Sequence, residues 1–235
     1  LLRGIGAQAL FDRIRVGDEL ARTRHAQGVV EGKLAGLGFA QRQELAAEAW
    51  AQDAMSTSAI EGERLDLLTV RSSVARRLGT AAQKGPATPR HVDGLLDIMD
   101  DAVTRAGDPL THERLHGWQA ALFPTGFSGM RPVRTAAYRT DEMQIVSGRP
   151  GMEKVHYEAP GPREVPGEMQ RLLDWFNTSH GWDSIVKAAV SHVWFETVHP
   201  YDDGNGRVGR NIVDLCLARE AGETSRLVRV SQRLL

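Results

Sequence analysis

Apolar side chains recur every three or four residues through most of this sequence, which is the spacing of one face of an α-helix. Glycine or proline interrupts the pattern several times, and each interruption indicates a helix end. The residues before about Ala40 also look helical. The other predicted helices cover residues 43–60, 67–78, 89–107, 111–124, 166–177, 184–197 and 205–220. The pattern therefore predicts a mainly α fold.

Individual residues indicate where these helices begin and end. Thr88 and Thr111 carry hydroxyls that can cap a helix N-terminus, and Pro89 suits the first helical position. Gly62 suits the C-terminal cap of the first of these helices, and Gly79 ends the next.

The pattern changes after residue 123. Residues 123–142 are rich in Gly, Pro, Ser and Thr and are predicted to form a loop. Residues 143–148 and 155–158 flank an Arg-Pro-Gly turn at 149–151, which predicts one small β-hairpin. Residues 227–235 could begin a further helix. The whole chain is therefore expected to be helical with a single hairpin.

Charge and cysteine content exclude some functions. The chain has 29 Lys and Arg against 30 Asp and Glu, so no strong basic field favours nucleic acid or an anionic membrane as a partner. No apolar run approaches the roughly 20 residues that span a bilayer. The single Cys216 allows no internal disulfide and indicates a reducing, cytoplasmic location. The first residue is not Met, so the true N-terminus and any targeting signal are expected to lie upstream.

Residues 199–210, with the sequence HPYDDGNGRVGR, carry the most chemistry. They join two predicted helices, and the glycines and the free N–H groups of the second helix can form an anion cradle. Asp203 inside such a cradle implies a bridging divalent cation such as Mg²⁺. Arg207 and Arg210 lie three positions apart, where both can reach phosphate oxygens. His199 can accept a proton from a hydroxyl near neutral pH.

Each of these features alone has an ordinary structural explanation. A His beside a Pro is usually structural, and a Gly-x-Gly is usually only a turn. Their occurrence together within a dozen residues favours a functional site.

The segment resembles the signature of the Fic family, H-x-[F/Y]-x-[D/E]-G-N-G-R-x-x-R, and it meets every specified position. The similarity runs from about Thr111 to Glu220. It implies a Fic-type helical bundle with a hairpin flap, an N-terminal helical region at 1–107 and a catalytic core at 108–235. The implied activity is transfer of AMP from ATP, with Mg²⁺, to a Ser, Thr or Tyr of a target protein. Gly206 favours AMP transfer, because Doc-type relatives that transfer phosphate carry Lys there.

The resemblance also assigns roles by position. His199 is the expected general base and Asp203 the Mg²⁺ carboxylate. The hairpin at 143–158 is the expected flap, which would align the target's backbone by strand addition. Tyr201 stands where Phe is commoner, so its hydroxyl needs a partner. The expected phosphate-binding residues are Gly204, Asn205, Gly206, Arg207 and, for the γ-phosphate, Arg210.

A second motif resembles the family's inhibitory helix, [S/T]-x-x-x-E-[G/N], at Thr57, Glu61 and Gly62. It closes the helix expected at about 43–62, so inhibition would occur within the same chain. Glu61 is expected to pair with Arg210 and displace the γ-phosphate, and Thr57 to steady the helix.

Two other functions stay open. Glu61 could align a water that removes AMP from a modified protein, or the chain could be a binding module with vestigial catalysis. A homodimer is possible. Some residues are expected to have no role in chemistry: His192 is expected to be structural, and Glu63 with Arg64 is expected to form a solvated face.

Overall fold

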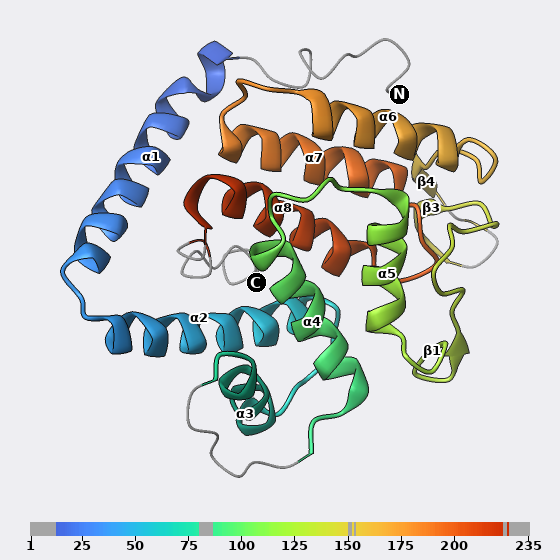
Figure 1. Ribbon diagram of the computed structural model, residues 1–235. Helices are drawn as coiled ribbons and strands as arrows, with labels where there is room; N and C mark the ends of the chain where they lie inside the picture. Colours follow the sequence, from blue (N-terminus) through green and yellow to red (C-terminus); the bar gives the residue numbers. More distant parts are fainter. Residues whose placement is uncertain (1–12, 80–86, 150–151, 153, 223–224, 226–235) are drawn as a thin grey trace.

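The computed structural model describes residues 13–79, 87–149, 152, 154–222 and 225. Figure 1 shows a mainly helical molecule, as predicted. Its helices are α1 (Arg13–Ala35), α2 (Phe39–Ile60), α3 (Leu67–Arg77), α4 (Arg90–Thr104), α5 (His112–Leu122), α6 (Val165–Thr178), α7 (Ser184–Val198) and α8 (Asn205–Ala221). Its strands are β1 (Phe127–Ser128), β2 (Arg131–Pro132), β3 (Gln144–Ser147) and β4 (Lys154–Glu158).

Helix α8 lies at the centre of the fold. It packs against α7 on one side and α4 on another, and α6 covers α7 (Figure 1). One buried apolar cluster includes Trp50 of α2, Leu96 of α4, Phe195 of α7 and Ile212 of α8. Because this cluster contains residues from both sides of position 107, the early helices and the later ones share a core. The division at 107/108 stays a prediction.

Most of the predicted helix ends are confirmed. Gly62 adopts a left-handed φ of +78° just after α2, and its N–H donates to the Ala59 carbonyl. The next N–H, of Glu63, reaches back to the Ser58 carbonyl at 2.9 Å, which completes a Schellman motif. The Oγ1 of Thr111 accepts from the Arg114 N–H at 3.2 Å and caps α5.

Two helix starts differ from the prediction. Pro89 rather than Thr88 is the N-cap of α4, so the predicted cap was one position early. The Thr88 hydroxyl instead accepts a hydrogen bond from Arg76. Helix α2 begins at Phe39, four residues before the predicted start, with Gly38 as its N-cap in extended conformation.

The predicted hairpin is confirmed as the antiparallel pair β3–β4, with Gln144 opposite Glu158 and Ser147 opposite Lys154. An irregularity between Ile145 and Val146 shifts the register. The second pair, β1–β2, lies inside the segment predicted to be only loop. The strand residues are too few to show an alternating pattern in the sequence. The turn at 150–151 and the helix start expected at 227–235 lie outside the described residues.

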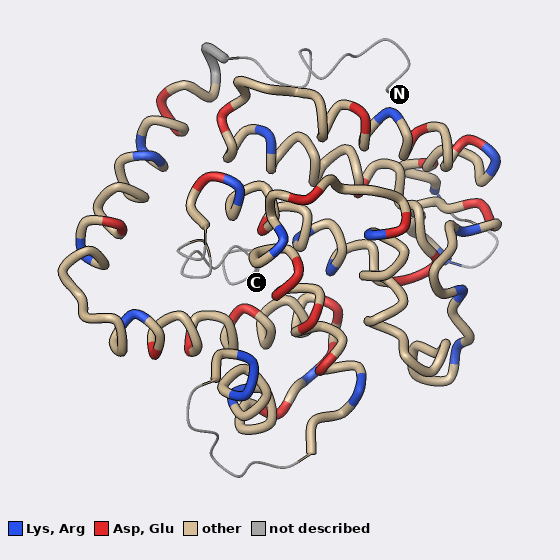
Figure 2. The backbone as a smooth tube through the Cα atoms, viewed as in Figure 1, with Lys and Arg blue, Asp and Glu red and all other residues tan. Residues whose placement is uncertain are grey.

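Charges of both signs are spread over the molecule, in keeping with the balanced composition (Figure 2). Arg24 of α1 uses one guanidinium to bind Asp183, at the start of α7, and Glu220, at the end of α8. These contacts hold the otherwise exposed α1 against the bundle. In the described part of the chain, no helix is both long and apolar enough to cross a membrane.

Candidate functional site

The signature loop turns sharply between α7 and α8 because two residues adopt left-handed backbone. His199 ends α7 with φ +49° and ψ 62°, which is unusual for a residue with a Cβ. Gly204 precedes α8 with φ +86°. A Cβ on Gly204 would lie 2.9 Å from Cε2 of Phe123, so glycine is required there for space as well as for backbone conformation.

Asn205 braces this loop from inside. Its amide nitrogen donates to the Tyr201 carbonyl at 2.7 Å, and its Oδ1 accepts from the Tyr201 N–H at 2.9 Å. The side chain therefore bonds the loop's backbone through one amide hydrogen and its oxygen. What Asn205 can offer an anion is its own N–H, which α8 does not use because it lies in the first turn.

The hydroxyl of Tyr201 has the partner that the sequence required. Tyr201 is fully buried, and its hydroxyl lies 3.0 Å from Nδ1 of His116 on α5. The rings of Tyr138 and Phe195 pack around it. The Tyr201–His116 bond fixes the loop to α5 and makes Tyr an acceptable substitute for Phe.

The structure brings the two sequence motifs together. Arg210 donates from Nη2 to Glu61 Oε1 at 2.6 Å, although the two residues are 149 positions apart. Its Nε donates to the Thr57 hydroxyl at 2.7 Å. The Arg210 side chain is 8% exposed and that of Glu61 29%. Thr57 and Glu61 therefore hold one buried guanidinium from neighbouring turns of α2.

The carboxylate of Glu61 lies directly over the first turn of α8. A Cβ added to Gly206 would overlap Glu61 Oε1 and come within 2.9 Å of the Arg210 guanidinium. This is the end of a helix where free N–H groups and the dipole attract anions. The Glu61 carboxylate therefore lies against the N-terminal turn of α8, beside Gly206.

The guanidinium of Arg207 has hydrogen-bond donors that are not satisfied by close contacts in the described part of the chain. It lies over the Phe123 ring, 5.1 Å from the centroid, and the side chain is 9% exposed. Its Nε is buried and has no hydrogen-bond partner among the described residues. Among the same residues its terminal nitrogens make only long contacts, at 3.6 Å to Glu63 and 3.9 Å to Asp203, so a phosphate oxygen could bind them.

Glu63 and Arg64 were predicted to form a solvated face; Arg64 is exposed, whereas Glu63 is only partly exposed and contacts charged groups. Its carboxylate lies 3.6 Å from Arg207 Nη1 and 3.1 Å from Nε2 of His91. Glu63 follows the Schellman turn at Gly62, which directs it back toward the signature loop. Its position two residues after Glu61 was the only sequence signal that could have indicated this contact.

Asp203 directly precedes Gly204, the first residue of the predicted phosphate-binding segment. Its Oδ1 accepts the Gly204 N–H at 2.6 Å and lies 3.9 Å from Arg207 Nη2. No group of three or more His, Cys, Asp or Glu side chains is arranged to hold a metal in the described part of the chain. The donor set fits Mg²⁺ bound by one carboxylate together with substrate phosphates, the usual arrangement for this ion.

His199 lies beside a carboxyl group that the sequence analysis missed. Oε2 of Glu196, one helical turn earlier, is 3.7 Å from His199 Nδ1. Burial lowers the pKa of His199 and raises the pKa of Glu196 to about 7. Because burial disfavours charge on both groups, this contact is not a full ion pair near neutral pH. His199 is therefore held as a neutral imidazole that can accept a proton.

Gly209 allows Glu196 to approach. A Cβ at Gly209 would lie 2.5 Å from Glu196 Oε1 and 3.0 Å from Nδ1 of His192. His192 packs inside the interface of α7 and α8, where burial lowers its pKa. Its position fits the structural role expected for it.

The geometry defines a helical protein in which a sharply turning loop leads into a central helix, and a glutamate that follows α2 contacts the first turn of that helix. Residues 109–217 match the model of the Fic/DOC family, and residues 7–80 match a domain of unknown function, DUF4172. The chain therefore carries a Fic domain, and residues 109–217 belong to the Fic/DOC family.

Similar proteins agree with this assignment. The chain is 23% identical over 209 residues to a protein adenylyltransferase Fic of Culex quinquefasciatus, covering 86% of this chain and 38% of that protein. It is 31% identical over 80 residues to a protein of Aquifex aeolicus named as a probable protein adenylyltransferase, covering 34% of this chain and 23% of that one. The chain thus spans well under half the length of these relatives.

Solved structures share the fold. A Fic family protein from Desulfovibrio desulfuricans superposes with a TM-score of 0.60 at 21% identity, covering 94% of this chain and 61% of that one. A Fic domain containing signaling protein from Bacteroides thetaiotaomicron gives a TM-score of 0.60 at 21% identity, covering 80% and 70%. The Fic-type helical bundle with its hairpin is therefore the fold of this chain.

Proposed function

We propose that this protein transfers AMP from ATP to a Ser, Thr or Tyr hydroxyl of a target protein, and that Glu61 keeps it inactive by occupying Arg210. The observation that carries the proposal is the position of Glu61. Its carboxylate lies on the first turn of α8 and bonds Arg210 at 2.6 Å. An anion site that attracts a carboxylate from within the chain also suits a phosphate.

The signature loop provides the other groups that a triphosphate needs. The N–H groups at the start of α8, near Gly204 and Gly206, would hold the α- and β-phosphates. The terminal guanidinium nitrogens of Arg207 would bind beside them. Arg210, once released by Glu61, would bind the γ-phosphate. Asp203 would hold Mg²⁺, whose charge offsets that of the phosphates.

His199 would act on the target. Its neutral imidazole accepts the proton of the target hydroxyl while that oxygen bonds to the α-phosphorus. The bond between the α-phosphorus and the bridging oxygen breaks, and pyrophosphate leaves. The residues of the loop orient the ATP so that this attack is in line.

The β3–β4 hairpin would hold the target segment. Ile145, Val146 and Val155 are exposed apolar residues on it, at 61%, 46% and 49%. The structure describes no third strand beside this pair, so an edge is open in the described part of the chain. An extended segment of the target could add to that edge by backbone hydrogen bonds. A homodimer stays a prediction.

Label incorporation from α-labelled ATP into a cell lysate tests the proposal. The Glu61→Gly protein is expected to label proteins more strongly than wild type, and the Glu61→Gly, His199→Ala protein is expected to label none. Absence of label with every variant contradicts AMP transfer and favours a binding module. If Glu61→Gly instead abolishes release of AMP from labelled proteins, Glu61 serves hydrolysis and the AMP-removing function replaces the proposed one.

A further inference from the structure

The C-terminal end of α7 carries His199 and leaves several carbonyl groups without helical partners. Three of them are satisfied by side chains. The carbonyl of Thr197 accepts from the Tyr157 hydroxyl at 2.7 Å. Those of Val198 and His199 accept from the guanidinium of Arg139, at 3.3 Å and 2.8 Å. The strained His199 is therefore held by residues outside its own helix.

Both of these side chains belong to the hairpin or to its base. Tyr157 lies on β4, opposite Ile145 of β3. Arg139 lies a few residues before β3, and it also donates to the Asp141 carbonyl at 2.7 Å and to the Pro160 carbonyl at 2.5 Å. Asp141 precedes β3 and Pro160 follows β4, so one guanidinium joins both ends of the hairpin's base to the end of α7.

Arg139 is 2% exposed, and burial lowers its pKa. A buried cation is costly unless its donors are satisfied. Here four hydrogen bonds go to carbonyl oxygens, and the backbone N–H of Arg139 adds a fifth contact, to the Pro200 carbonyl at 2.9 Å. The rigid planar fork of Arg makes these contacts in several directions, which the single ammonium of Lys cannot do.

We propose that Arg139 is a positioning residue for the transfer reaction, and that Arg139 and Tyr157 form a clamp that holds the β3–β4 hairpin at a fixed distance from His199. The inference rests on the proposed function of the hairpin and His199. The hairpin would hold the target hydroxyl, and His199 would take its proton. Both are then positioned through the same three carbonyls at the end of α7, because the clamp binds these carbonyls. A small misplacement of reacting groups lowers the rate steeply.

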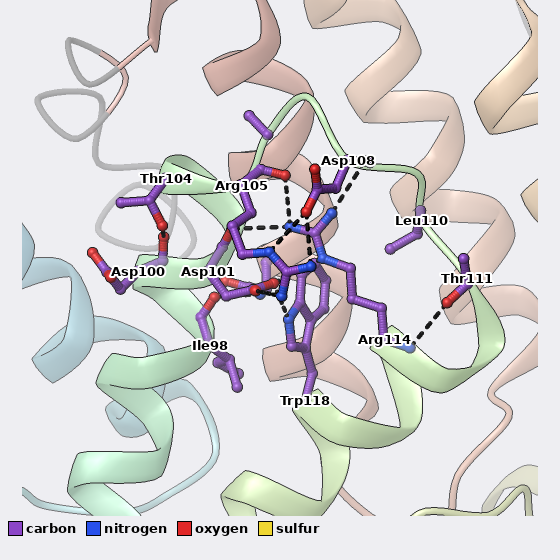
Figure 3. A network of polar contacts seen from close by, with 12 residues as sticks. Ile98, Asp100, Asp101, Thr104, Arg105, Asp108, Leu110, Thr111, Arg114 and Trp118 are labelled. Atoms are coloured by element: carbon purple, nitrogen blue, oxygen red, sulfur yellow. Dashed lines mark hydrogen bonds and ion pairs between the residues drawn. The ribbon is translucent and has the colours of Figure 1, made fainter.

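Arg114 of α5 offers a matched control. Arg114 is also buried, with a side chain 7% exposed, and it also binds carbonyls near a helix C-terminus. It donates to the carbonyls of Asp101, Arg105 and Asp108 and to the Asp101 carboxylate, as Figure 3 shows. None of these groups touches the signature loop. Arg114→Lys therefore shows how much stability is lost when a buried Arg is replaced away from the signature loop.

The test compares Arg139→Lys, Tyr157→Phe and Arg114→Lys, each in the Glu61→Gly protein. Self-modification with α-labelled ATP gives kcat and the KM for ATP. Arg139→Lys is expected to lower kcat by roughly tenfold to a hundredfold with KM changed less than about twofold, and Tyr157→Phe to lower it less. Arg114→Lys is expected to leave kcat unchanged at a similar loss of Tm. Equal kcat in Arg139→Lys and Arg114→Lys would overturn the clamp.

Amide hydrogen exchange gives a readout that does not need activity. Arg139→Lys is expected to raise exchange in residues 144–149 and 199–204 together, while Arg114→Lys raises neither. If exchange rises in only one of these segments, the clamp does not couple them and the inference fails. If the Glu61→Gly protein transfers no AMP but exchange rises in both, the proposed function fails and the clamp stands as a structural coupling.

Discussion

The proposed inhibition by Glu61 predicts a gain in activity when its contact with Arg210 is weakened. A hydrogen bond to a charged group contributes about 1.5–3 kcal/mol. Because the Glu61 side chain is 29% exposed, solvent screens the charges, and the contribution of the Glu61–Arg210 bond is expected near the lower end of this range, about 1.5 kcal/mol. Glu61→Gln removes the charge but keeps an acceptor oxygen, and since 1.4 kcal/mol corresponds to tenfold, it is expected to raise kcat/KM for ATP in AMP transfer severalfold, by at most about tenfold.

Glu63 provides the comparison. Its carboxylate lies 3.6 Å from Arg207, too far for a hydrogen bond, and its side chain is 34% exposed. Glu63→Gln is therefore expected to raise kcat/KM by only about twofold. A double-mutant cycle with Arg210→Ala isolates the contribution of the Glu61–Arg210 contact, because the gain from Glu61→Gln requires Arg210. Equal gains from Glu61→Gln and Glu63→Gln, or a full gain without Arg210, would refute the reasoning.

Two further predictions follow from the signature loop. Tyr201→Phe removes the bond to His116 Nδ1 and is expected to lower the free energy of unfolding by about 1 kcal/mol, measured in urea; no change would show that the bond contributes nothing. Burial lowers the pKa of His199 from 6.5, so the base stays neutral to lower pH than an exposed imidazole. The transfer rate of the Glu61→Gly protein is then expected to fall only below pH 6.5, and a midpoint above that value would contradict the assignment of His199 as the base.

Local signals in the sequence predicted much of the fold. The hydroxyl of Thr111 and the glycine at 62 act on their own helix ends, so their roles depend on few distant residues. The hairpin at β3–β4 was visible because its turn and its flanking strands are contiguous. The Thr88 cap was misplaced by one residue because Pro89 is itself compatible with the position before a helix.

The parts of the site that were missed depend on tertiary contacts. Glu196 resembles any other polar residue in a helix, and its environment arises only because Gly209 of α8 leaves room for it. Glu63 reaches Arg207 because a turn reverses the chain direction after α2. Arg139 lies in a segment predicted to be loop, and its partners are carbonyls, which carry no sequence signal.

The pairing of Glu61 with Arg210 could be predicted only through the family resemblance. Neither residue's neighbours indicate a contact across 149 positions. The structure now places the two groups together and adds Thr57 as a second partner of the same guanidinium.

The most direct test of the central claim uses ATP labelled on either the α- or the γ-phosphorus. We expect the Glu61→Gly variant to label target proteins from α-labelled ATP and not from γ-labelled ATP. Adding His199→Ala is expected to remove the α label. Label from γ-labelled ATP would show phosphate transfer rather than AMP transfer. Undiminished α label after His199→Ala would show that His199 is not the base, and either result would contradict the account.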